Sequence, residues 1–83
     1  MDIKNILSNI KPLRPDREKI LYYSFLTRQG KTSLVKGEEM LGMFKYILEN
    51  NEIKEYSSEV SKLSYIIQKL YNVNTYSILQ RGV

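Results

Sequence analysis

The feature that most constrains the fold is a set of apolar residues near the end of the chain that recurs at helical spacing. Its members follow one another at intervals of three, four and three residues: Val60, Leu63, Ile67 and Leu70. Because an α-helix makes one turn every ~3.6 residues, these side chains share one face. Ser57 is a favourable N-cap residue, so we predict a helix over residues 57–71. A helix that is apolar on one face must bury that face against other elements, which predicts a packed helical bundle.

Further helices are predicted along the rest of the chain. They cover residues 2–10, 15–29, 38–49 and 75–80, with a short turn over residues 32–36. Pro15 suits the first turn of its helix, and Gly30 can adopt the left-handed conformation that ends it. Gly37 weakens a helix and separates the short turn from the helix that follows. The β-branched residues of the last segment also allow a strand there.

These segments predict an all-α fold, a compact bundle of four to five short helices in one domain spanning residues 1–83. The predicted core consists of Ile20, Leu21, Phe25, Leu41, Phe44, Leu48, Val60, Leu63, Ile67 and Leu70. Two stretches could each form a helix-turn-helix, the DNA-binding module that best fits a chain of this length. One joins the helix that ends at Gln29 to the helix that starts near Ser33, and the other covers residues 66–82.

The chain contains no cysteine and no histidine. Disulfides and thiolate or imidazole metal sites are therefore excluded, and we expect no cofactor. General acid–base chemistry would have to use Glu, Asp, Lys or Tyr, and no grouping of these resembles a catalytic site, so we expect no enzymatic activity. No apolar run approaches the roughly 20 residues that span a bilayer, and no signal peptide is recognisable. We therefore expect a cytoplasmic protein without a membrane span.

The stretch RQGKTS, residues 28–33, contains the Gly-Lys-Thr that ends a phosphate-binding loop. Such a loop also needs a glycine five residues before Gly30, so that its backbone can wrap around the phosphates. Phe25 occupies that position, inside a predicted helix and without a preceding strand. The simpler interpretation is that Gly30 ends one helix and Thr32 or Ser33 begins the next.

Positive charge is concentrated in one part of the chain. The net charge is +4, and residues 11–36 hold seven basic side chains against Asp16 and Glu18. The basic residues are Lys11, Arg14, Arg17, Lys19, Arg28, Lys31 and Lys36. Tyr22 and Tyr23 lie among them, and one exposed tyrosine could stack on an unpaired base. The first function hypothesis is therefore a small regulatory or accessory protein that binds nucleic acid through these nine residues.

The second hypothesis belongs to another class. An amphipathic helix could instead present an apolar face to a protein partner, as in an adaptor, an inhibitor or an immunity protein with no nucleic-acid role. A small core without disulfides or metals also makes a homodimer plausible. The two hypotheses differ in one structural expectation, because nucleic-acid binding requires the seven cations to gather on one face.

Overall fold

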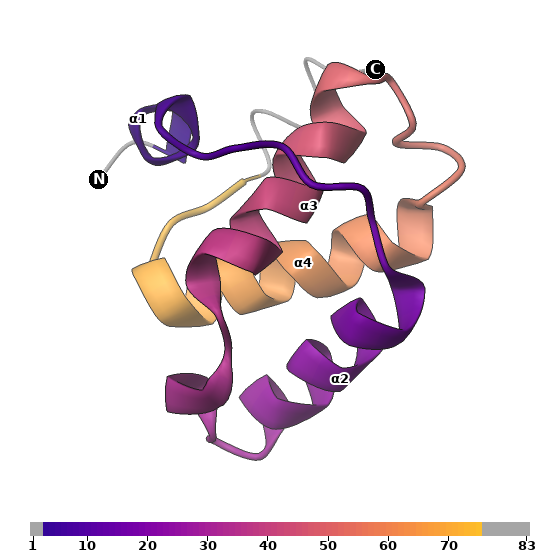
Figure 1. Cartoon of the computed structure of the whole chain (residues 1–83). Coiled ribbons are helices and arrows are strands. Elements are labelled where there is room, and N and C mark those ends of the chain that lie inside the picture. Colours follow the sequence, from indigo (N-terminus) through magenta and orange to yellow (C-terminus); the bar gives the residue numbers. More distant parts are fainter. Residues whose placement is uncertain (1–2, 76–83) are drawn as a thin grey trace.

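The computed structural model describes residues 3–75, and all regular elements in that range are helical (Figure 1). They are α1 (Ile3–Ser8), α2 (Arg17–Arg28), the 3₁₀ helix η1 (Thr32–Leu34), α3 (Gly37–Glu49) and α4 (Ser57–Tyr71). The predicted all-α class is confirmed, and α4 has the predicted bounds. The predicted segment 75–80 lies outside the described residues, except for Thr75, which has no regular structure.

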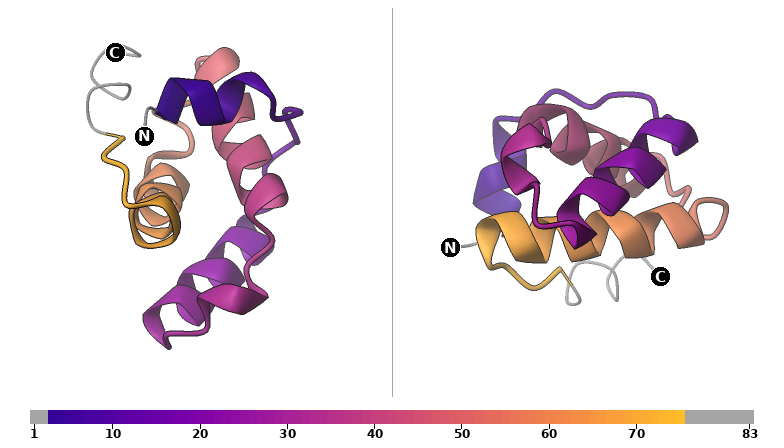
Figure 2. Two further views of the ribbon diagram at one scale, coloured as in Figure 1. Left: turned by 90° about the vertical axis from the view of Figure 1, so that its left-hand side faces the viewer. Right: turned by 90° about the horizontal axis from the view of Figure 1, so that it is seen from below.

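Helix α4 is the element on which the others are assembled. Both α2 and α3 pack against it, while α1 packs against α3. Figure 1 shows α4 running across the view with α3 running steeply past it, and the right-hand view in Figure 2 shows α2 packed obliquely against α4. The apolar face that the sequence indicated for α4 is therefore covered from two sides, with Leu63, Ile66 and Ile67 fully buried.

The core differs from the prediction in α2. Leu21 and Phe25, both predicted to be buried, are 59% and 56% exposed. The face that α2 buries consists of Ile20, Tyr23, Ser24, Leu26 and Thr27. Thr27 can turn inward because its hydroxyl donates a hydrogen bond to the carbonyl oxygen of Tyr23 at 2.8 Å, which satisfies the buried polar atom. The prediction was wrong for Leu21 and Phe25 because α2 carries apolar residues on both its inner and its outer side, so hydrophobicity did not distinguish the buried face.

The other predicted core positions are at least partly buried. Ile20, Leu41, Phe44, Val60, Leu63 and Ile67 belong to the buried cluster, and Leu48 and Leu70 pack against it while remaining partly exposed. Met40, Met43 and Ile47 join the fully buried side chains from α3. Almost the whole inner surface of α3 is therefore apolar, as its spacing indicated.

The ends of α2 are set by local chemistry. Asp16 is the N-cap, and its side chain accepts a hydrogen bond from the backbone N–H of Lys19 at 3.2 Å. Pro15 therefore precedes the helix rather than occupying its first turn as predicted. Gly30 has φ +75°, and the chain closes the helix through the bond from Lys31 N–H to the carbonyl of Leu26 at 2.9 Å.

The connection from α2 to α3 bears on the predicted helix-turn-helix. It covers residues 29–36 and contains η1, so it is longer than the roughly 3–4 residues of that motif's turn. Both helices pack mainly on α4. The second candidate, residues 66–82, extends beyond the described residues.

An extended segment, residues 9–16, crosses the outer side of α3. The backbone N–H of Leu13 donates to the carbonyl of Gly42 at 3.0 Å. Lys45 on α3 donates to the carbonyls of Leu7 and Ile10 at 2.8 and 2.9 Å, which ties the end of α1 to the same helix. The N-terminal part of the chain is therefore held on α3 by hydrogen bonds to its own backbone.

Candidate interaction surfaces

Arg17 lies at the start of α2 and faces α4. Its Nε is 3.6 Å from a carboxylate oxygen of Glu59, and its guanidinium lies over the ring of Tyr56, 4.4 Å from the centroid. Its Nη2 also donates to the carbonyl of Glu55 at 3.3 Å. Arg17 is thus engaged within the fold, although its partly exposed ion pair contributes little stability.

Arg28, at the other end of α2, faces the same neighbour. Its guanidinium lies 5.7 Å from the ring centroid of Tyr65 on α4. That ring also has the ammonium of Lys69 at 5.6 Å. Arg17 and Arg28 therefore border the line of contact between α2 and α4.

Lys19 projects from α2 toward α3 instead. Its ammonium is 3.2 Å from Oε2 of Glu39, and the hydroxyl of Tyr23 donates to Oε1 of the same carboxylate at 2.5 Å. Tyr23 is only 4% exposed. Of the two adjacent tyrosines, Tyr22 is therefore the one whose ring can meet a partner, since it is 55% exposed.

The Tyr23–Glu39 contact changes both pKa values. Burial, then the hydrogen bond and the negative charge of Glu39, raise the pKa of Tyr23 from 10.0 to about 12. The hydrogen bond from Tyr23, followed by the bond and charge of Lys19, lowers the pKa of Glu39. The contact is therefore strongest when the phenol is neutral and the carboxylate is charged.

We expect this contact to make stability fall at alkaline pH. Because the pKa of Tyr23 is higher in the folded state, its contribution is complete below pH 10 and is lost as pH rises toward about 12. Urea unfolding between neutral pH and pH 12 should show a smaller alkaline loss in Tyr23→Phe than in the wild type. Burial also raises the pKa of Tyr71, so part of the loss should remain. Tyr22→Phe is the matched control, and an equal flattening in that variant would contradict the assignment.

The other four cations are Lys11, Arg14, Lys31 and Lys36. Three of them line hollows beside α3, and Lys31 lies in the connection that follows α2. Lys11 and Lys36 line one groove, together with Asn9, Ile10, Leu13, Gly37, Glu38 and Glu39. Arg14 and Lys19 line an adjoining hollow with Leu13, Asp16, Glu39 and Met43. Lys31 is exposed in the connection after α2 and lines neither hollow.

The seven cations therefore do not gather on one face. Four of them, Lys11, Arg14, Lys19 and Lys36, border the two adjoining hollows, where three acidic side chains lie among them. Arg17 and Arg28 border α4. Some of the cations point in different directions because they pair with residues outside the basic segment. These partners are Glu39, Glu59, Tyr56 and Tyr65. Sequence reasoning missed them because their pairing depends on how the helices cross.

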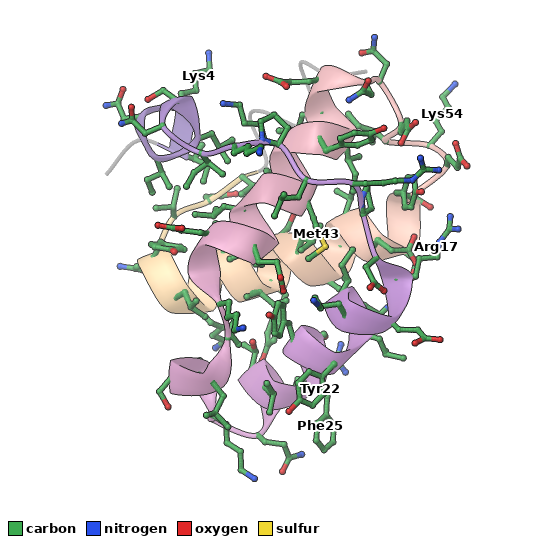
Figure 3. The ribbon with its side chains drawn as sticks, viewed as in Figure 1. Lys4, Arg17, Tyr22, Phe25, Met43 and Lys54 are labelled. Carbon is green, nitrogen blue, oxygen red and sulfur yellow. The ribbon has the colours of Figure 1, made fainter. Side chains whose placement is uncertain are left out.

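The outer face of α2 is apolar. Leu21, Tyr22 and Phe25 are each more than half exposed, and Figure 3 shows Tyr22 and Phe25 at the edge of the molecule. Leu34 on η1, which packs against α2, is also exposed. The sequence signal for this face was present, since α2 carries apolar residues on more than half of its circumference. Leu21, Tyr22 and Phe25 together form the α2 face.

Comparison with known proteins identifies no relative of this chain. The chain matches no family model, no curated protein and no solved structure. Among residues 3–75, no group of acidic side chains is placed to hold a metal ion. No helix in that range is both long and apolar enough to cross a membrane. The surfaces described above are therefore the basis for any functional conclusion.

Proposed function

We propose that the protein acts by binding another polypeptide chain through the α2 face. The observation that carries this proposal is the exposure of three large apolar side chains, Leu21, Tyr22 and Phe25, on adjacent turns of one helix. Small monomeric proteins rarely expose contiguous apolar surface of this kind unless it takes part in an interaction. Tyr and Phe are also among the residues enriched at the centres of protein interfaces.

The inner side of α2 supports the same proposal. Ile20 and Leu26 are buried on this helix together with Tyr23, Ser24 and Thr27, while Leu21 and Phe25 face outward. A helix that served only the bundle would be expected to carry polar residues on its outer face. The arrangement is instead that of a helix with two apolar sides, one for the core and one for a partner.

Site-specific photo-crosslinking tests this proposal. A benzophenone side chain in place of Phe25, in cells that express the protein, should give adducts of defined mass with a polypeptide. The matched control places the same group at Lys54, an exposed residue that Figure 3 shows at the opposite end of the molecule. Absence of adducts at Phe25, or an identical pattern from both positions, would overturn the proposal.

Nucleic-acid binding is kept as a second candidate on a narrower set of residues. Lys11, Arg14 and Lys36 are exposed, and none forms an ion pair of hydrogen-bonding length within residues 3–75. Lys11 and Lys36 are far apart in sequence but line one groove at the start of α3. Cations free of carboxylate partners can contact phosphates at lower cost than those already paired.

Fluorescence anisotropy with double-stranded DNA, single-stranded DNA and RNA tests this second candidate. Glutamine at Lys11, Arg14 and Lys36 together should weaken binding about tenfold and reduce the salt dependence by about three counterions. The control places glutamine at Lys54, Lys62 and Lys69, which changes the net charge equally. Equal weakening by both triple variants would show that only the overall charge matters, and absence of binding at low salt would remove this candidate.

A further inference from the structure

We infer that the polypeptide bound by the α2 face is a second copy of this chain, with the two α2 helices paired antiparallel across a two-fold axis. This inference rests on the proposed function and names the partner of the same surface. It follows from the order of side chains along the helix, which is self-complementary.

The α2 face has an apolar middle and opposite charges at its ends. Glu18 precedes Leu21 by three residues, and Arg28 follows Phe25 by three. In an antiparallel pair, a two-fold axis at the level of Tyr23 brings Leu21 opposite the partner's Phe25. The same axis brings Glu18 toward the partner's Arg28, so each apolar contact and each charge pair occurs twice.

The charges at both ends are available for such pairing. Glu18 is exposed and forms no ion pair within residues 3–75. Arg28 is exposed at the edge of α2 beside α4, and pairing with the partner's Glu18 would replace its contact with the ring of Tyr65 at 5.7 Å. A parallel arrangement would instead place Glu18 beside the partner's Glu18. The antiparallel arrangement also opposes the two helix dipoles, which favours it further.

The size of the face sets the strength of the contact. A helix of 12 residues is about 18 Å long, so one helix pair buries less surface than a standard stable interface. We therefore expect a reversible dimer with a dissociation constant on the order of micromolar or weaker. An 83-residue chain has a small core. Association would bury a further apolar face and so increase the total apolar surface removed from water.

Sedimentation velocity over a wide range of concentration, up to millimolar, tests the inference with charge-reversal variants. Glu18→Arg alone and Arg28→Glu alone should each weaken self-association about tenfold, because symmetry turns two attractive pairs into two repulsive ones. An equimolar mixture of these two variants should associate about as strongly as the wild type, because each end then brings opposite charges together. Lys54→Glu, a reversal of equal size far from the α2 face, should leave association unchanged.

Three outcomes would overturn the inference: a wild type that stays monomeric throughout, single variants that associate like the wild type, or a mixture no stronger than either variant alone. Circular dichroism of each variant shows whether it is folded, and Glu18→Arg removes no ion pair within residues 3–75. Failure here is distinct from failure of the proposed function. A monomeric wild type whose Phe25 position still crosslinks to a different protein would refute the dimer and keep the binding function.

Discussion

Alanine in place of Phe44 is expected to lower the free energy of unfolding by about 4 kcal/mol, whereas alanine in place of Phe25 should change it by less than about 0.5 kcal/mol. These are the two phenylalanines of the chain, so the chemical change is the same. Phe44 is 0% exposed at the centre of the bundle, and its removal leaves a cavity that neighbouring side chains cannot fill. Phe25 is 56% exposed on the α2 face, and its removal leaves no cavity.

Urea and thermal unfolding of the two variants measure this contrast. The experiment should be done at a concentration that keeps the chain monomeric, so that loss of a dimer contact at Phe25 does not enter. For a domain of this size each kcal/mol moves Tm by about 4–8 °C, so the two variants should differ plainly in Tm. Comparable destabilisation by both would mean that α2 buries the face that the sequence indicated, and the α2 face would no longer be an exposed surface.

The parts of the fold that sequence reasoning predicted are those where one signal dominates. Helix α4 has a single apolar stripe and covers the predicted residues 57–71, although its N-cap is Tyr56 and not the predicted Ser57. Gly30 ends α2 because a left-handed residue was needed there and glycine adopts that conformation without strain. Local chemistry determines these features, so the sequence alone was sufficient.

The orientation of α2 could not be predicted in this way. Its buried face combines Ile20 and Leu26 with Ser24 and Thr27. Its exposed face contains Leu21 and Phe25. Hydrophobicity alone does not choose between these faces, because both are partly apolar and a polar residue of the inner face can find a partner that only the assembled fold provides. Tyr23 is an example, since its hydroxyl is paired with Glu39 from α3. A helix whose two sides are both partly apolar is ambiguous until its neighbours are known.

The directions in which the basic side chains point could not be predicted from the sequence, for a related reason. Charge counting along residues 11–36 identified the cations but not their directions. Arg17 and Lys19 are two residues apart, yet they point to different helices and pair with Glu59 and Glu39 respectively. Lys11 and Lys36 are distant in sequence, yet they line the same groove. Neither belongs to the α2 face, so a dimer formed through that face would carry two copies of this groove.

Alanine in place of Gly42 is expected to destabilise the protein by about 2 kcal/mol, although helix propensity alone predicts a gain of about 1 kcal/mol. A Cβ at this position would lie 2.6 Å from the carbonyl oxygen of Lys11 and 2.9 Å from Cγ of Leu13. The obstacle is largely backbone, and the bond from Leu13 N–H to the carbonyl of Gly42 holds that backbone against α3. The crossing segment must therefore move away and lose its hydrogen bond.

Gly37→Ala provides the matched comparison for Gly42→Ala, because both glycines belong to α3 and both have a close neighbour. At Gly37 that neighbour is the hydroxyl end of the Tyr71 side chain, which can rotate aside. Chemical unfolding should thus show a clearly smaller loss for Gly37→Ala. Amide hydrogen exchange should also show faster exchange of the Leu13 N–H in Gly42→Ala alone, because that bond is the one broken. An unchanged Leu13 rate, or a stabilised Gly42→Ala variant, would mean that the N-terminal segment does not depend on close approach to α3.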